Sequence, residues 1–137
     1  MIIHGNESQT ERRQIIVADN KYVFNDISHI RKMLYKRHRV FISKNVTIKN
    51  NVEILENVFI GENTYIGENV FIGNCVNIGT DSVIENDAVI LDYVDIKNSV
   101  IVKDNASIGY CSILEDNTVI DSYYQMGDFN SDMMEDY

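Results

Sequence analysis

The chain has 137 residues, with 21 acidic against 12 basic side chains, two cysteines and no proline. This length is enough for one compact domain, and no apolar run is long enough to span a membrane. The first residues lack the apolar core of a secretory signal, so a cytoplasmic protein with free thiols is expected.

The charge divides the sequence into three parts. Residues 1–39 carry eight Lys and Arg against four Asp and Glu, residues 40–123 carry four Lys against thirteen acidic residues, and residues 124–137 carry four acidic residues and no basic one. We predict an N-terminal cap, a repeat domain and an acidic, flexible tail, in that order. Phosphate contacts need Lys and Arg, so the middle part is not expected to bind nucleic acid.

Two short apolar runs in the N-terminal cap, residues 14–17 and 22–24, predict a small hairpin. Asn25 or Asp26 can then cap a helix that starts near Ile27. A basic run lies on the helix and just after it: Arg31, Lys32, Lys36, Arg37 and Arg39. This run is either a solvated face of the cap or a contact for an anion, such as a phosphate, a nucleotide or an acidic protein. The acidic tail is itself a candidate partner.

A six-residue repeat continues without interruption from Val40 to Asp121. All fourteen hexads open with Val, Thr, Ser or Ala and place Ile, Val or Leu two residues later. This alternation predicts a three-residue strand in each hexad, and a fixed short period is typical of a solenoid. The fourth residue is often Gly and the sixth often Asn. Both tolerate a positive φ, so a tight corner is expected after each strand.

Two runs carry a family resemblance, Val-Phe-Ile-Gly-Glu-Asn at 58–63 and Val-Phe-Ile-Gly-Asn-Cys at 70–75. They resemble the hexapeptide repeat of the left-handed parallel β-helix superfamily, and the resemblance covers residues 40–123. It implies that three hexads form one triangular coil of eighteen residues, and that the fourteen hexads form nearly five coils. The predicted fold is therefore an all-β solenoid, a left-handed parallel β-helix with a small hairpin-plus-helix cap.

Coils of eighteen residues place every eighteenth residue in one surface column. One outward column is β-branched or aromatic throughout: Thr47, Tyr65, Val83, Ile101 and Val119. The other two outward columns are mixed: Phe41, Phe59, Asn77, Asp95 and Ile113, and Glu53, Phe71, Val89 and Ser107. A continuous apolar stripe usually marks an interface, and the resembled superfamily is typically trimeric. We predict that the first column joins the subunits of a homo-oligomer, with a trimer favoured. The alternative is simple β-propensity on an exposed strand.

One predicted corner column reads Asn57, Cys75, Tyr93 and Cys111. Two coils would separate the two thiols by about 10 Å. That distance is too long for a disulfide, so both cysteines are expected to be free.

Many members of the resembled superfamily are acyltransferases that use acyl-CoA or acyl carrier protein. The resemblance implies a His general base in or beside the coils, in a cleft between subunits. No His lies between residues 40 and 123, and no inserted loop interrupts the hexads. His38, between Arg37 and Arg39 at the start of the first coil, is a weak candidate for the catalytic base. The γ-class carbonic anhydrases of this fold bind zinc through histidines in the coils. Since the coils of this chain contain no His, no metal site is predicted.

Non-catalytic relatives fit the sequence better. Left-handed β-helices serve as assembly modules in the dynactin pointed-end subunits and as C-terminal domains of sugar-nucleotide pyrophosphorylases, and residues 95–101 and the acidic tail look similar to these. We predict a non-catalytic oligomerisation or scaffold protein that needs no cofactor. The alternative is an acyltransferase with an atypical site, which would use acetyl-CoA.

Overall fold

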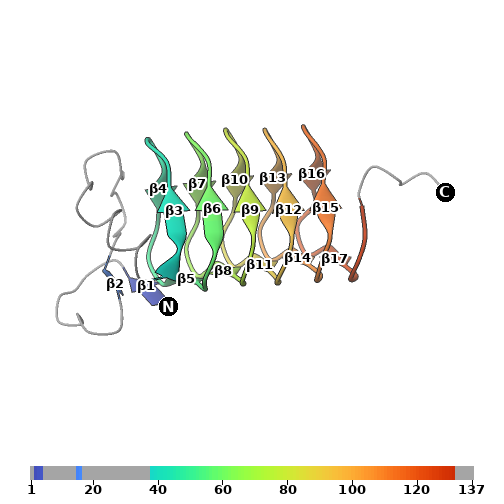
Figure 1. Cartoon of the computed structure of the whole chain (residues 1–137). Coiled ribbons are helices and arrows are strands. Elements are labelled where there is room, and N and C mark those ends of the chain that lie inside the picture. The colour runs from blue at the N-terminus through green and yellow to red at the C-terminus, as the bar shows by residue number, and fades with distance from the viewer. Residues whose placement is uncertain (1, 5–14, 17–37, 132–137) are drawn as a thin grey trace.

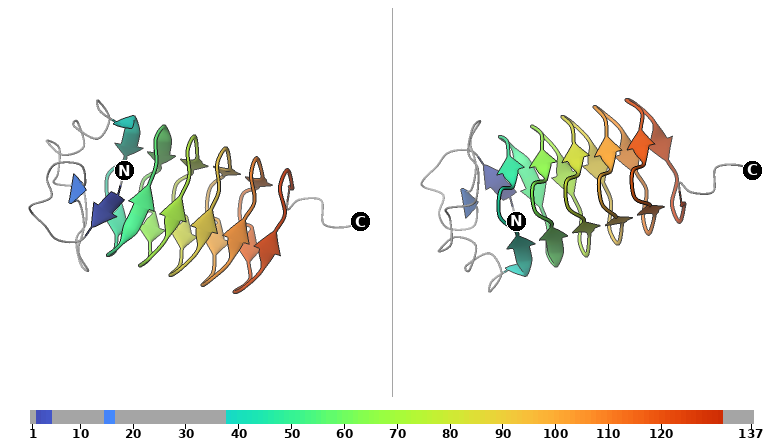
Figure 2. Two further views of the ribbon diagram at one scale, coloured as in Figure 1. Left: turned by 90° about the horizontal axis from the view of Figure 1, so that it is seen from below. Right: turned by 90° about the horizontal axis from the view of Figure 1, so that it is seen from above.

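A computed structural model describes residues 2–4, 15–16 and 38–131 of the chain. Residues from Val40 onward wind into a left-handed parallel β-helix whose coils stack along one axis (Figures 1 and 2). The predicted fold class is therefore confirmed. The second strand of the predicted hairpin, the helix from Ile27 and residues 132–137 lie outside the described residues.

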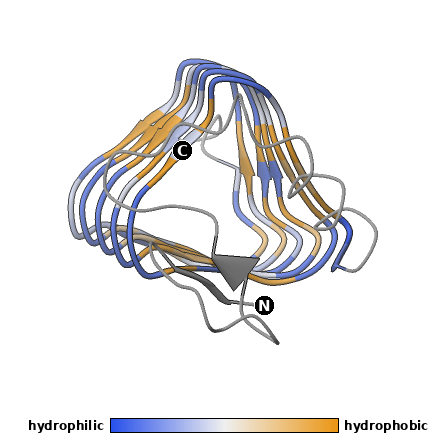
Figure 3. Cartoon of the chain, turned by 90° about the vertical axis from the view of Figure 1, so that its left-hand side faces the viewer, coloured by the Kyte–Doolittle hydropathy of each residue, from blue (hydrophilic) through white to orange (hydrophobic). Residues whose placement is uncertain are grey.

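Three flat faces give the solenoid the triangular cross-section visible in the end-on view (Figure 3). The β3 face contains β3 (Val40–Ile42), β6 (Val58–Ile60), β9 (Asn77–Ile78), β12 (Asp95–Ile96) and β15 (Ile113–Leu114). The β4 face contains β4 (Thr47–Ile48), β7 (Tyr65–Ile66), β10 (Val83–Ile84), β13 (Ile101–Val102) and β16 (Val119–Ile120). The β5 face contains β5 (Val52–Ile54), β8 (Phe71–Ile72), β11 (Val89–Ile90), β14 (Ser107–Ile108) and β17 (Gln125–Met126).

The strand register confirms the eighteen-residue coil. Val83 pairs with Tyr65 on one side and with Ile101 on the other, each eighteen positions away. The same offset joins Asp95 to Asn77 and to Ile113 on the β3 face. All three predicted outward columns are therefore present, each on its own face.

The third residue of each hexad fills the interior with one stacked column for each face. Ile42, Ile60, Ile78 and Ile96 are 0% exposed, and the matching Ile residues of the other two faces are at most 3% exposed. Burying one such side chain contributes about 1.5–3 kcal/mol before conformational entropy is subtracted. Each strand is only two or three residues long and cannot be stable by itself. The stacked interior columns are therefore the main source of stability.

Three hydroxyl side chains replace Val at buried opening positions, and each has a hydrogen-bond partner. The Thr64 hydroxyl donates to the Gly79 carbonyl at 2.9 Å. The Ser82 hydroxyl accepts from the Val100 amide at 3.1 Å, and the Ser112 hydroxyl donates to the Gly127 carbonyl at 3.2 Å. Buried polar groups with such partners avoid most of the cost of desolvation.

Every described corner turns through a left-handed residue at the sixth position of its hexad. These residues have φ between 57° and 66°: Arg39, Asn45, Asn51, Asn57, Asn63, Asn69, Cys75, Asp81, Asp87, Tyr93, Ser99, Asn105, Cys111, Asn117, Tyr123 and Phe129. The predicted role of Asn at these corners is confirmed. The predicted role of Gly is wrong, because none of the described glycines has a positive φ.

Glycine at the fourth position instead allows the next coil to approach closely. A Cβ atom on Gly73 would lie 2.9 Å from the backbone nitrogen of Asp92. The Asp92 carboxylate occupies the space beside Gly73 and accepts a hydrogen bond from the Asn74 amide at 2.8 Å. Asn98 does the same beside Gly79, where it accepts from the Thr80 amide at 2.9 Å.

Each end of the solenoid has a strand outside the predicted elements, β1 at the first coil and β17 at the last. At the first coil, β1 (Ile2–His4) pairs antiparallel with β5, and β2 (Ile15–Ile16) pairs parallel with β1. β1 therefore covers the open edge of the β5 face. At the other end, β17 pairs with β14 and buries Met126, so the solenoid continues past the predicted boundary at residue 123.

Candidate interaction surface

The outward column of the β4 face, named here the β4 column, lies on one continuous parallel sheet. It comprises Thr47, Tyr65, Val83, Ile101 and Val119. Val119 is 50% exposed, whereas the side chains of the other four residues are less exposed than that of Val119. Exposure of the whole column was expected. Each side chain covers part of its neighbour about 4.8 Å away, so a shallow apolar strip remains accessible.

Charged side chains border the β4 column near Tyr65. Lys49 places its ammonium 5.8 Å from the centre of the Tyr65 ring, within the range of a cation–π contact. The pKa of the Tyr65 phenol is raised, first by partial burial and then by the negative charges of Glu68 and Glu85. The phenol therefore stays neutral at physiological pH and presents an apolar ring with a polar rim, a combination common in protein interfaces.

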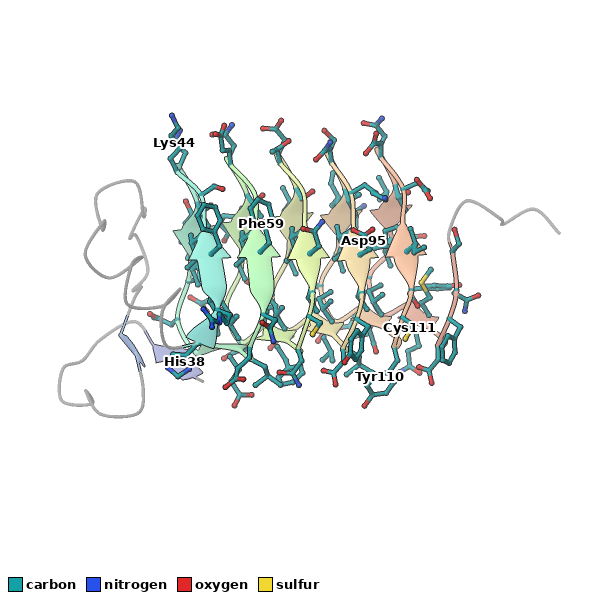
Figure 4. All side chains as sticks on the ribbon, viewed as in Figure 1. His38, Lys44, Phe59, Asp95, Tyr110 and Cys111 are labelled. Carbon is teal, nitrogen blue, oxygen red and sulfur yellow. The ribbon has the colours of Figure 1, made fainter. Side chains whose placement is uncertain are left out.

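The β3 face changes character along the axis. Phe41 and Phe59 stack with ring centroids 5.3 Å apart, and they are 43% and 39% exposed. The next two members form a polar pair, in which the Asn77 amide donates to the Asp95 carboxylate at 3.1 Å. Lys97 lies 3.2 Å from the same carboxylate. Figure 4 shows Phe59 and Asp95 on this face. The face therefore lacks the continuous apolar strip of the β4 column.

The predicted corner column is present between the β5 and β3 faces. Figure 4 shows His38 at one end of this corner and Tyr110 and Cys111 further along it. Cys75 and Cys111 are free, as predicted. The pKa of the Tyr93 phenol is raised, chiefly by the charge of Cys75 and the hydrogen bond with it. The sequence placed these residues in one column but did not reveal how exposed the aromatic members are.

The basic run is described only at its end. Arg39 is exposed at a corner with φ of 57°, and His38 beside it is half-buried. Their carbonyl groups accept hydrogen bonds from the Asn57 and Val58 amides, at 3.2 and 3.1 Å, so both residues belong to the first coil. The other four predicted contacts, Arg31, Lys32, Lys36 and Arg37, lie outside the described residues.

The described part of the chain has neither a metal-ligand cluster nor a membrane-spanning helix. Among those residues, no three His, Cys, Asp or Glu side chains gather as a metal-ligand set. Within the same part of the chain, no helix has the length and apolar character needed to cross a bilayer.

Comparison with known proteins matches the solenoid to one family. The sequence model of the GMPPB C-terminal domain, a left-handed β-helical domain of the hexapeptide type, matches residues 42–128. A solved structure from Bacillus cereus, provisionally described as an acetyltransferase, is similar at 20% identity and a TM-score of 0.43. That similarity covers 65% of this chain and 66% of the other, so the chain spans just under two thirds of that protein. No curated protein sequence matches.

Proposed function

Since this chain belongs to the GMPPB C-terminal domain family, we propose that it is a non-catalytic module that assembles proteins through its β4 column. The family description names a domain at the end of a longer protein, which suits a structural module. The observation that carries the proposal is the β4 column itself. Five neighbouring strands of one sheet present Thr, Tyr, Val, Ile and Val in register, and none of these outward side chains carries a charge.

The expected assembly is a homotrimer in the cytoplasm. The flat β4 faces of three subunits can pack around a threefold axis parallel to the solenoid. This arrangement would bury the β4 columns of all three subunits. Closed rotational symmetry of this kind is the usual form of homo-oligomers. The neutral Tyr65 ring would lie within such an interface, and the alkyl chain of Lys49 would lie at its edge.

The test is the mass of the purified full chain in solution. Light scattering should give about three times the monomer mass of 15.8 kDa. Tyr65→Lys with Ile101→Lys should lower the mass, because two charges would enter the apolar strip. Val89→Lys with Ser107→Lys, at the same hexad position on the β5 face, is the matched control and should keep the wild-type mass. An unchanged mass for the first variant would refute an interface at the β4 column.

An acyltransferase is the second candidate, and His38 is the base that it would use. Half-buried at the first corner, His38 has the partial shielding from water that suits a general base. Calorimetry with acetyl-CoA separates the two functions. Micromolar binding that His38→Ala weakens would replace the scaffold proposal, whereas a stable oligomer without binding supports it.

A further inference from the structure

One corner of the solenoid carries more bulky side chains than the other two while sharing their backbone. We name it the Tyr93 corner. Its sixth-position residues are Arg39, Asn57, Cys75, Tyr93, Cys111 and Phe129, and the residues before them are His38, Glu56, Asn74, Asp92, Tyr110 and Asp128. The corner between the β3 and β4 faces has only small polar residues at the sixth position: Asn45, Asn63, Asp81, Ser99 and Asn117. The corner between the β4 and β5 faces has a single aromatic residue there, in its last coil: Asn51, Asn69, Asp87, Asn105 and Tyr123.

The aromatic residues of the Tyr93 corner gain little from the fold of one chain. Tyr93 and Phe129 have φ of 64° and 60°, a left-handed conformation that bulky residues rarely adopt. Their side chains are 61% and 77% exposed, and Tyr110 beside them is 44% exposed. Unfavourable backbone and exposed aromatic rings together indicate a surface that becomes buried against a partner.

The position of this corner is compatible with the proposed assembly. Each coil passes from the β3 face to the β4 face and then to the β5 face, and the Tyr93 corner joins the β5 face to the next β3 strand. It is therefore the corner opposite the β4 face. An oligomer that buries the β4 column would leave the Tyr93 corner on its outside, so the two surfaces can act independently.

The charges along the Tyr93 corner suggest which partner fits. The first row holds His38 and Arg39, and the last holds Asp128 and Phe129. Five coil spacings of about 4.8 Å separate these two rows, roughly 24 Å in all. Between them the corner rows contain Glu56 and Asp92 but no Lys or Arg. A second copy placed antiparallel would bring the basic end of one corner against the acidic and aromatic end of the other.

We propose that two copies of this chain pair antiparallel along the Tyr93 corner, about a twofold axis between the rows of Cys75 and Tyr93. Arg39 of each copy then faces Phe129, where a guanidinium can stack on the ring, and His38 faces Asp128. Both ends of the interface gain the same contacts, as expected for a twofold interface.

The middle rows are also complementary in this register. Glu56 faces Tyr110, whose phenol can donate to the carboxylate. Asn74 faces Asp92, and Cys75 faces Tyr93, so no acidic side chain opposes another. A twofold axis through the row of Tyr93 would instead place Asp92 against Asp92, and like charges at that distance repel.

A cross-linking experiment tests both the contact and its register. In the variant Asn57→Cys with Cys75→Ser, the new thiol should face Cys111 of the other copy. Within one chain the same two positions are three coils apart, about 14 Å, which is beyond disulfide reach. Mild oxidation of the full chain should therefore give a covalent dimer that reduction reverses. Position 57 should accept Cys, because Cys75 and Cys111 occupy equivalent corners with nearly the same φ.

Two controls define the result. Adding Cys111→Ser to the variant, or making Cys75→Ser alone, should abolish the dimer band, with circular dichroism confirming that all variants fold. Absence of the dimer from the first variant, or an equal amount of dimer in the controls, would overturn the proposed pairing.

A second measurement separates this contact from the proposed function. The corner is narrow, and small interfaces are usually weak, so sedimentation is run at high protein concentration. Tyr93→Lys with Phe129→Lys should remove the twofold contact, whereas Asn63→Lys with Ser99→Lys, at the corner between the β3 and β4 faces, should not. With the β4 column disrupted by Tyr65→Lys and Ile101→Lys, the corner dimer should persist. The proposal would be contradicted if Tyr93→Lys with Phe129→Lys left the mass unchanged. It would also be contradicted if only Asn63→Lys with Ser99→Lys lowered the mass.

Discussion

The interior columns and the corners of this solenoid differ in the range of residue types that they accept. Inside, the third residue of fourteen hexads is always Ile, Val or Leu. At the corners, the sixth residue varies from Asn to Tyr, yet φ stays between 57° and 66°. The stacked interior and the interstrand hydrogen bonds therefore set the path of the chain, and the corner residues adopt the conformation that this path requires. The core has little chemical freedom, whereas the corners can acquire other roles.

The largest expected effect is in the interior. Ile84 is 0% exposed in a middle coil, and Ile84→Asp would bury an unpaired carboxylate at a cost of several kcal/mol. That cost is comparable to the whole stability of a small domain, so the variant should not fold. Circular dichroism would show this, with Ser107→Asp on the outer surface as the folded control. If the Ile84→Asp protein melted cooperatively, the interior columns could not be the main source of stability.

The next effect lies where one coil touches the next. A Cβ on Gly79 would lie 2.6 Å from the Lys97 carbonyl oxygen, so Gly79→Ala should lower the unfolding free energy by about 1–3 kcal/mol. Gly127→Ala is the matched control, because its Cβ would meet only the side-chain Nδ2 of Asn130, at 3.5 Å. Its effect should stay within about 0.5 kcal/mol. Equal losses in urea denaturation would show that close approach is not why Gly79 is required.

Exchanging corner residues should give a smaller effect of either sign. Tyr93 and Asn63 have φ of 64° and 61°, and Asn accepts this conformation more readily than Tyr. Tyr93→Asn should therefore stabilise the monomer by about 1 kcal/mol, and Asn63→Tyr should destabilise it by a similar amount. Denaturation at low protein concentration measures this difference without a contribution from self-association. A destabilised Tyr93→Asn monomer would mean that Tyr93 contributes to folding of the single chain.

The smallest effect concerns the charge at one corner. The pKa of Glu85 is raised by its partial desolvation and then by the hydrogen bond and negative charge of Asp104. The folded state therefore favours protonated Glu85. This stabilisation is complete below the pKa of the unfolded chain, near 4.5, and it is lost as pH rises through the higher folded pKa. Glu85→Gln should thus be slightly more stable than wild type at pH 7, by a few tenths of a kcal/mol.

The check is to measure the unfolding free energies of wild type and Glu85→Gln at a series of decreasing pH values. The stabilities of wild type and Glu85→Gln should converge as pH falls below the folded pKa of Glu85, because both side chains are then neutral. A difference that stays constant with pH would rule out the interaction with Asp104 as its cause.

The sequence predicted what repeats and failed where the repeat is broken or where distance between coils decides. The β4 column and the Cys75–Tyr93 stacking follow from the period alone. The role of Gly73 and Gly79 was misread, because composition suggests a positive φ while the actual constraint is the approach of the next coil. β17 was missed because Gln125 and Met126 depart from the Val-x-Ile pattern.

The candidate surfaces were predicted unevenly for the same reason. Sequence alone placed the β4 column on one face, but it could not show that neighbouring side chains half-bury four of its members. The pairing of β1 with β5 was also beyond prediction, since Ile2–His4 has no periodicity and its partner lies about fifty residues away. Contacts of that kind depend on the folded end of the solenoid rather than on local pattern.

The eighteen-residue register also limits how this gene can change length. Each coil bonds only to its neighbours, as the Val83 pairs with Tyr65 and Ile101 show. A deletion of one or two residues would shift interior positions onto the surface in every later hexad. A deletion of six would preserve the interior but rotate each later column onto the next face. Only whole coils can be gained or lost without disturbing the β4 column, so homologues should differ in the repeat by multiples of eighteen codons.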